Sequence, residues 1–233
     1  MSAADDTDPA ETPSGGGRAG GLGVHGTRAP TQSADGIVTG NTFDKYGSQN
    51  PVVRWLMAGF ERNLADLFAS AEPKSVLDVG CGEGILTHRW ASEVAPGRVV
   101  GIDLDDPLIA AEWALRRAPN LEFIAQRAEN LPFADNEFDL ATATEVLEHV
   151  PDPGHTLSEM ARCARRHVLI SVPHEPLWRI LNMARGAYWR QRGNTPGHIN
   201  HFSRAAIVSL CAQHGDVIET RSPFPWTMVL VRV

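Results

Sequence analysis

The chain has 233 residues, of which 42% are apolar and 21% are charged, so it is long enough for one catalytic α/β domain but not for two. Its net charge of −7 disfavours a protein that binds DNA or RNA through a basic face. The three scattered cysteines argue against a disulfide framework. The sequence contains neither a long apolar run nor a signal-peptide pattern, and we therefore expect a cytoplasmic protein without a membrane span.

Residues 1–40 differ in composition from the rest of the chain. They contain nine of the 21 glycines, with proline, serine, threonine and aspartate between them and few large apolar side chains. Such a segment cannot bury enough apolar surface to offset the entropy lost on ordering. We therefore predict a disordered tail over residues 1–40 and one folded domain over residues 41–233.

The folded part alternates between helix and strand patterns. Apolar residues at three- and four-residue spacing predict a helix over residues 51–69, with Asn50 as its cap. Strands alternating with helices indicate a parallel sheet covered on both faces, here ending in a closing pair of strands. The strands are expected at 75–79, 98–103, 121–125, 138–143, 167–172, 216–220 and 226–231, and the other main helices at 85–94, 106–117, 155–164 and 203–214.

A glycine-rich loop follows the first strand, where residues 76–84 read VLDVGCGEG. Glycines let the chain turn sharply from strand to helix and let a ligand touch the backbone. Asp78 and Glu83 flank the loop. Their carboxylates would repel a pyrophosphate but attract an ammonium or a sulfonium group. The loop therefore favours a cationic cofactor of amino-acid type over a dinucleotide.

An acidic residue, Asp103, ends the second strand within the sequence GIDLD. A carboxylate at this position can accept hydrogen bonds from both hydroxyls of a ribose. The alternative is that Asp103 or Asp105 merely caps the next helix. With the glycine loop upstream, we favour the ribose role.

These motifs resemble those of class I S-adenosylmethionine-dependent methyltransferases, in particular the small-molecule "type 11" group that includes the enzymes of ubiquinone and menaquinone biosynthesis. VLDVGCGEG and GIDLD are similar to the first two motifs of that family, and AENLPF at 128–133 followed by FDL at 138–140 is similar to its third. The resemblance covers about residues 74–172. It implies an α/β, Rossmann-like fold: a seven-stranded, mostly parallel sheet with helices on both faces and a reversed last strand.

The same resemblance implies contacts to S-adenosylmethionine. The glycine loop would hold the methionine part, Asp103 the ribose, and Leu104 and the backbone near Ala128 the adenine. Where the family often has an acidic residue beside the adenine amino group, this chain has Arg127, which cannot accept a hydrogen bond, and Gln126 can substitute for it. The expected cofactor residues are Asp78, Gly80, Cys81, Gly82, Asp103, Leu104, Ala128 and Glu145.

The sequence E-x-x-E-H follows the fourth strand, at the edge of the sheet where ligands gather. Two interpretations stay open. Glu145 can cap backbone groups while His149 packs under the cofactor, or the segment can bind Mg²⁺ or Mn²⁺. The pattern is similar to that of ubiquinone-pathway O-methyltransferases and of small-RNA 2′-O-methyltransferases, which pair it with a distal histidine. The metal set expected from this resemblance is Glu145, Glu148, His149 and His201.

Three histidines are candidates for taking a proton from the methyl acceptor at neutral pH, namely His149, His174 and His201. His174 follows the fifth strand and therefore points to the same edge of the sheet. It is equally well explained as a turn residue before Pro176.

The connection over residues 174–202 is long enough to be a lid, and apolar residues within it predict a helix with one apolar face. Five arginines and no acidic residue lie between Pro176 and Gly215. They can steer an anionic substrate, rest on an anionic membrane surface, or simply be solvated. Trp178, Tyr188 and Trp189 suit an aromatic or lipid-like acceptor.

The function predicted from these observations is methyl transfer from S-adenosylmethionine to a small molecule, with oxygen as the preferred acceptor atom and secondary, lipid or quinone-type metabolism as the setting. Two alternatives stay open: a metal-dependent RNA 2′-O-methyltransferase, which the negative charge disfavours, and a non-catalytic protein that binds S-adenosylmethionine. We expect a small-molecule partner, no contact with DNA, and at most peripheral contact with a membrane.

Overall fold

The computed structural model describes residues 31–32, 38–39, 49–184, 186 and 188–233. Near the N-terminus, β1 (Thr31–Gln32) and β2 (Val38–Thr39) form a short antiparallel pair. The rest of the segment 1–40 lies outside the described residues, so its disorder stays a prediction. None of the helices in the described ranges is long and apolar enough to cross a membrane.

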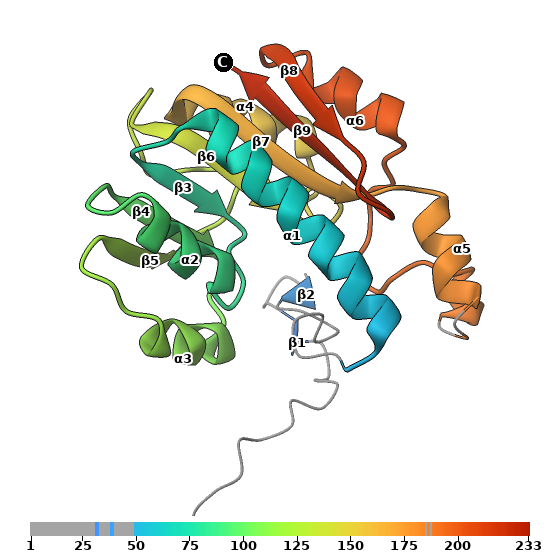
Figure 1. The fold of residues 1–233 in the computed structure, drawn as a ribbon. Helices are drawn as coiled ribbons and strands as arrows, with labels where there is room; N and C mark the ends of the chain where they lie inside the picture. The colour runs from blue at the N-terminus through green and yellow to red at the C-terminus, as the bar shows by residue number, and fades with distance from the viewer. Residues whose placement is uncertain (1–30, 33–37, 40–48, 185, 187) are drawn as a thin grey trace, which may run out of the picture.

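A seven-stranded sheet forms the centre of the domain, with the strand order β5-β4-β3-β6-β7-β9-β8 (Figure 1). The first five of these strands are parallel, whereas β9 runs antiparallel to both β7 and β8. This arrangement confirms the predicted fold class and the reversed last strand. The strands are β3 (Val76–Val79), β4 (Val99–Asp103), β5 (Leu121–Ala125), β6 (Phe138–Thr144), β7 (Ala164–Pro173), β8 (Asp216–Arg221) and β9 (Trp226–Arg232).

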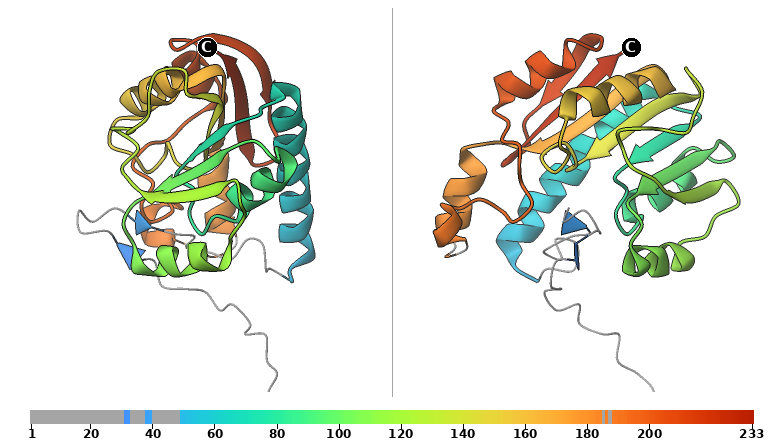
Figure 2. Two further views of the ribbon diagram at one scale, coloured as in Figure 1. Left: turned by 90° about the vertical axis from the view of Figure 1, so that its left-hand side faces the viewer. Right: turned by 180° about the vertical axis from the view of Figure 1, so that it is seen from behind.

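Helices cover both faces of this sheet, because successive side chains of a strand point to opposite faces. Val76 and Leu140 pack with α1 and α2 on one face, while their neighbours Leu77 and Ala141 pack with α4 and α6 on the other. Figure 2 shows the two layers from further sides. The helices are α1 (Pro51–Ala71), α2 (Ile85–Glu93), α3 (Pro107–Leu115), α4 (Pro153–Cys163), α5 (Leu177–Ala184) and α6 (Arg204–Cys211).

Three helices begin with the same device, a capping side chain followed by proline. Asn50 caps α1, Asp106 caps α3 and Asp152 caps α4, each accepting a hydrogen bond from a backbone N–H of the first turn. Because Asp106 caps α3, the alternative in which Asp103 or Asp105 has that role is wrong.

The strand order reverses between β3 and β6, since β4 lies on one side of β3 and β6 on the other. In open α/β sheets a crevice forms outside the carboxyl ends of the strands at such a point. The predicted lid, residues 174–202, follows β7 and contains α5 and a 3₁₀ turn, η1 (Trp189–Gln191). In Figures 1 and 2, α5 stands at the edge of the molecule, beyond the end of β7.

Candidate active site

A cleft lies at the carboxyl ends of β3, β4 and β6. All eight predicted cofactor residues line it. Other parts of its wall come from α1, from the segment after β5, from the E-x-x-E-H segment and from the start of β9. These further lining residues include Met57, Phe60, Gln126, Arg127, Thr144, His149 and Trp226.

The glycine loop is held against β4, because the backbone N–H groups of Gly80 and Cys81 both donate to the carbonyl of Ile102, at 2.8 and 2.9 Å. Gly80 has φ 71°, and a Cβ atom there would lie 2.5 Å from the side chain of Val146. Gly82 has φ 53°, but among the described residues, its two chain neighbours aside, no atom lies within 4 Å of the place a Cβ would take. The loop therefore needs glycine for its turn at both positions and leaves open space beside Gly82, where a ligand can approach the backbone.

Trp113 of α3 supports this loop from outside. Its indole Nε1–H donates to the carbonyl of Gly82 at 2.8 Å, and its ring stacks on Phe123 with centroids 5.1 Å apart. Sequence analysis missed this residue. The only available signal was a tryptophan in the helix that follows the ribose motif.

Asp103 joins the second strand to the glycine loop. Its Oδ2 accepts a hydrogen bond from the backbone N–H of Gly82 at 2.7 Å, and its Oδ1 accepts one from Leu104 at 2.8 Å. Burial raises the pKa of this carboxyl above its usual value. Each carboxylate oxygen has a second lone pair for a ligand hydroxyl. The geometry thus fixes the orientation of Asp103 and leaves it able to accept further hydrogen bonds.

Asp78 is buried beneath the loop, with only 2% of its surface exposed. Thr87 donates to its Oδ2 at 2.7 Å and Thr142 donates to its Oδ1 at 2.9 Å. Burial outweighs these two hydrogen bonds and raises the pKa of Asp78 to about 7. A cation in the cleft would favour the ionised form. Neither threonine was identified from the sequence, because their closeness to Asp78 depends on helix and strand packing.

The segment after β5 forms another part of the wall. The backbone N–H of Gln126 donates to the carbonyl of Asp103 at 2.8 Å, and its side-chain amide donates to the carbonyl of Asn130 at 2.5 Å. The amide oxygen of Gln126 can accept a hydrogen bond, whereas the guanidinium group of Arg127 cannot. Arg127 forms an ion pair with Glu129 at 3.2 Å.

Glu145 lies at the end of β6 in a left-handed conformation, with φ 61°. Its Oε1 accepts a hydrogen bond from Ser171 at 2.9 Å, and its Oε2 accepts one from the indole N–H of Trp226 at 2.7 Å. A non-glycine residue in this conformation is strained and persists only when its surroundings hold it. Here β7 and β9 supply that support, and sequence analysis anticipated neither partner.

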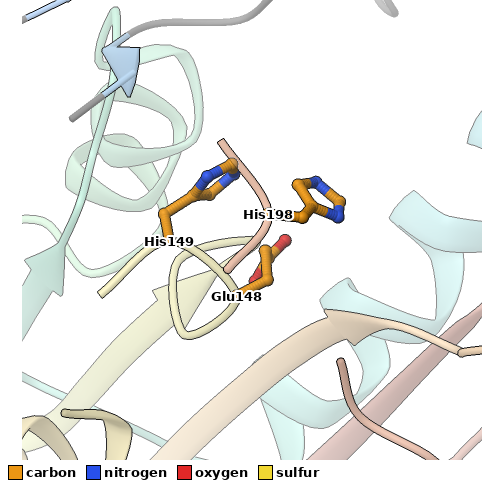
Figure 3. Close-up of side chains that lie close together, drawn as sticks. All are labelled: Glu148, His149 and His198. Carbon is orange, nitrogen blue, oxygen red and sulfur yellow. The ribbon is translucent and has the colours of Figure 1, made fainter. Parts of the chain in front are cut away.

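Glu148, His149 and His198 come together beside the cleft, and Figure 3 shows their side chains close to one another. One potential ligand atom from each lies within 4.8 Å of the others. The Nδ1–H of His149 donates to the carbonyl of Gly197 at 2.9 Å. The carbonyl of Glu148 accepts from the backbone N–H groups that follow His198, at 2.9 and 3.0 Å. The lid is thus fastened to the E-x-x-E-H segment through backbone contacts.

This cluster differs from the metal set expected from the sequence. Glu148 and His149 belong to both, but the carboxylate of Glu145 is directed to Ser171 and Trp226, and the cluster takes His198 in place of His201. The exposed ring of His201 hydrogen-bonds Asn194 at 2.8 Å. The four predicted ligands therefore do not meet. Glu145 is held by Ser171 and Trp226, and the lid turns His198 inward and His201 outward.

The three candidate catalytic histidines are also separated. His149 lines the cleft, whereas His174 and His201 are not among the described residues that form its wall. His174 is half-buried where β7 meets the lid, and its backbone N–H donates to the carbonyl of Pro225. Burial lowers the pKa of His201. Of the three, His149 is the one that the fold brings to the cofactor residues.

Aromatic rings continue from the cleft into the lid. Phe60 meets Trp226 edge-on at 4.9 Å between centroids, and Trp226 in turn lies 5.8 Å from Trp178. Trp178 is parallel to His198 at 6.4 Å. Phe60 and Trp226 both line the cleft. One side of the cleft is therefore aromatic.

The fold and this cleft define an α/β protein with its main cleft at the switch point of a mostly parallel sheet. A family described as "Methyltransferase domain" matches residues 53–219, and the chain belongs to this family. It is an S-adenosylmethionine-dependent methyltransferase, as the motifs predicted.

The chain is similar to curated enzymes of quinone biosynthesis. A ubiquinone biosynthesis O-methyltransferase of Hahella chejuensis is 32% identical over 169 residues, covering 66% of this chain and 70% of that protein. A demethylmenaquinone methyltransferase of Paenarthrobacter aurescens is 35% identical over 134 residues, covering 52% and 49%. Thus the match spans about half of the second relative.

Solved structures share the fold at low identity. Magnesium protoporphyrin IX methyltransferase from Synechocystis PCC 6803, with bound SAH, has a TM-score of 0.57 and 19% identity over 79% of this chain and 88% of that chain. An S-adenosylmethionine-dependent methyltransferase described as putative, from Listeria monocytogenes, has a TM-score of 0.59 and 15% identity, with coverage of 75% and 96%.

Proposed function

We propose that the enzyme transfers a methyl group from S-adenosylmethionine to a hydroxyl oxygen of a small aromatic acceptor of lipid or quinone type. The observation that carries this proposal is the position of His149 and an aromatic wall in the same cleft as the cofactor residues. The names of the quinone-biosynthesis relatives support the acceptor class.

The residues of the cleft fit the cofactor. Asp103 would accept hydrogen bonds from the ribose hydroxyls, the open space beside Gly82 would admit the methionine part, and the buried carboxylate of Asp78 would attract its ammonium group. Leu104 would pack on the adenine, and the Gln126 side chain would accept from its amino group. The carboxylates of Asp78 and Asp103 together favour a cationic cofactor.

The proposed reaction is an in-line displacement in which His149 acts as the general base. The acceptor oxygen attacks the methyl carbon, the bond from that carbon to sulfur breaks, and S-adenosylhomocysteine leaves. The hydroxyl proton moves to Nε2 of His149, because Nδ1 carries the hydrogen that is donated to Gly197. Most of the rate enhancement would come from holding the two reactants in line.

A second candidate mechanism is favoured by the cluster in Figure 3. Glu148, His149 and His198 offer one carboxylate and two imidazoles, a donor set that suits a divalent transition metal such as Mn²⁺. The carbonyl of Gly197 fixes the tautomer of His149, as the outer partners of metal-binding histidines commonly do. A divalent ion bound here would lower the pKa of the acceptor hydroxyl. In this case His149 would be a ligand and not a base.

The acceptor is tested with purified enzyme, labelled S-adenosylmethionine and matched aromatic acceptors that carry either a hydroxyl or an amino group. We expect the label on oxygen, with little transfer to the amine. His149→Ala should lower the rate of transfer about 10²- to 10⁴-fold, whereas His88→Ala, a control on α2, should retain it. A label found on nitrogen or carbon contradicts the proposal, and labelled RNA from a cell extract would favour the RNA alternative.

The metal is tested by measuring metal content and the visible absorption of the Co²⁺-loaded protein. If the cluster binds a metal, His198→Ala should lose the bound ion while His88→Ala keeps it, and a chelator should abolish activity. Full activity in chelator, with no bound metal, rejects this second mechanism and leaves His149 as the base. The cytoplasmic location stays a prediction under either mechanism.

A further inference from the structure

Helix α3 is packed on one side only. Its nine residues include a single charged one, Glu112, and of the nine only Ile109 is buried. Leu115 is 78% exposed and Leu108 is 41% exposed. A helix that is hydrophobic on every side is usually covered on every side. The domain therefore leaves an apolar surface of α3 uncovered.

The inner side of α3 supports the glycine loop. Trp113 donates to the carbonyl of Gly82, and the carboxylate of Glu112 pairs with Arg116 at 2.8 Å. At 3.6 residues per turn, the residues on the side away from Ile109 and Trp113 are all uncharged. They are Pro107, Leu108, Ala110, Ala111, Ala114 and Leu115, and all six are exposed. We call these six residues the α3 face.

The two ends of the α3 face carry opposite charges. Asp105 is exposed two residues before Pro107, and Arg117 is exposed two residues after Leu115. The Nε–H of Arg117 donates to the carbonyl of Ala114 at 3.2 Å, which ties this side chain to the end of the α3 face. A carboxylate thus precedes the face and a guanidinium follows it.

The α3 face is accessible in the fold. Helix α3 connects β4 with β5, and β5 is an edge strand of the sheet. In Figures 1 and 2, α3 stands at the periphery of the molecule, and none of the described helices and strands lies beyond it. A partner can therefore reach the α3 face without displacing another element.

We propose that the α3 face docks on the same face of a second copy of the chain, so that the two helices pair antiparallel. Two-fold symmetry then centres the contact near Ala111, where a small side chain lets the helices approach closely. Leu108 precedes Ala111 by three residues and Leu115 follows it by four, so Leu108 of one copy packs near Leu115 of the other. Asp105 of each copy meets Arg117 of the other, and opposite charges attract at both ends.

The charges favour a second copy over a lipid surface as the occupant. An uncharged face can meet itself without repulsion, whereas anionic headgroups would repel Asp105 and a chain with a net charge of −7. A standard interface has about 20–30 residues on each side, and the α3 face is smaller. We therefore expect a dimer that dissociates on dilution. The inference does not depend on the proposed function, because the opposite side of α3 supports the cleft.

The association is tested by sedimentation velocity of the full chain over a wide range of protein concentrations. We expect a monomer–dimer equilibrium. Leu115→Asp should raise the dissociation constant more than about 100-fold, because both copies lose a buried leucine and gain a charge. The matched control is Ile180→Asp, which changes a 53% exposed aliphatic residue on α5 and should leave the equilibrium unchanged.

The antiparallel orientation is tested by reversing the charges at the ends. Asp105→Arg or Arg117→Asp alone would place like charges together at both ends and should weaken the dimer roughly 2- to 30-fold. The double variant restores opposite charges, and its dissociation constant should return close to that of the wild type. In a parallel pair like charges would already face each other, so the single variants would change little.

Several results would overturn the proposal. One is a chain that stays monomeric at every concentration, and another is a monomer that binds lipid vesicles through Leu115. A dimer that survives Leu115→Asp, or that Ile180→Asp weakens equally, would place the interface elsewhere. A double variant as weak as the single ones would reject the antiparallel arrangement. Binding of S-adenosylhomocysteine, measured on every variant, shows that each is folded.

Discussion

The two halves of the cleft are built in different ways. The half that we propose for the cofactor, here called the cofactor half, comes from β3, β4 and the loops directly after them, and it is held by backbone contacts such as those of Asp103 with Gly82 and Leu104. The half that we propose for the acceptor, here called the acceptor half, combines the end of β6, the start of β9 and the lid. Short stretches of sequence therefore determine the cofactor half, whereas the acceptor half depends on how distant segments pack. Relatives that share one cofactor can differ in substrate through this second half.

The sharpest test of this division is His149→Ala. If His149 is the general base, its loss should lower turnover about 10²- to 10⁴-fold, because the acceptor proton loses its proposed receiver. Affinity for S-adenosylhomocysteine should stay the same, since the cofactor half is untouched. Single-turnover kinetics and calorimetric titration measure the two quantities. A parallel loss of cofactor affinity would show that the halves are not separate.

The converse variant is Asp103→Ala, which should affect the cofactor half. Removing an acceptor of the ribose hydroxyls costs about 1–3 kcal/mol, so affinity for S-adenosylhomocysteine should fall roughly 5- to 150-fold. Calorimetric titration is the measurement. The control is Asp105→Ala, which removes an exposed carboxylate two residues further along the chain. Unchanged affinity in Asp103→Ala would remove this residue from the site.

Trp226→Phe should affect the acceptor half through Glu145. The variant keeps an aromatic ring against Phe60 but loses the indole N–H that holds Glu145, at a cost of about 1–2 kcal/mol. We expect kcat/KM to fall roughly 5- to 30-fold with cofactor affinity retained. Weaker binding of S-adenosylhomocysteine with unchanged turnover would instead assign Glu145 to the cofactor half.

The charge of Asp78 should make cofactor affinity depend on pH. Its pKa is about 7, raised by burial, and only the ionised carboxylate attracts the ammonium group of the cofactor. Affinity should thus be highest above pH 7 and should fall about tenfold between pH 8 and pH 6 as the carboxyl gains a proton. Titrations across this range check the sign, and Asp78→Asn should flatten the curve.

The smallest effect is expected from the tail. A variant that begins at Thr39 should keep its melting temperature, because a segment of this composition buries little apolar surface. Thermal unfolding of the two chains is the measurement. A marked drop would show that residues before Thr39 pack on the domain.

Much of the fold could be predicted because each strand and helix has a local pattern. Every predicted strand is present, with ends that differ by at most three residues. The largest difference, at β7, arises because Ala164–Arg166 pairs with the sheet although its pattern continues that of the preceding helix. Glycine spacing and an acidic strand end likewise predicted a set of residues that the structure brings together in one cleft.

The acceptor half could be predicted only in part. His201 was chosen as the distal histidine, but a one-dimensional pattern cannot say which of two nearby side chains, His198 or His201, a loop turns inward. The contacts of Asn200 with the carbonyls of Leu147 and Val150, at 3.0 and 2.7 Å, help set that choice. The partners of Glu145 were missed for the same reason, since Trp226 lies 81 residues away in the sequence.

The position of β9 has a consequence for the order in which the protein is completed. Of the seven strands, the one that is synthesised last is not an edge strand but lies between β7 and β8. Until it arrives, the backbone groups of β7 on that side remain unpaired, and an open strand edge can pair with other chains. The same strand delivers Trp226 to Glu145. Closing the sheet and completing the acceptor side of the cleft are therefore a single event, so an unfinished chain that already has its cofactor motifs cannot yet have a finished catalytic site.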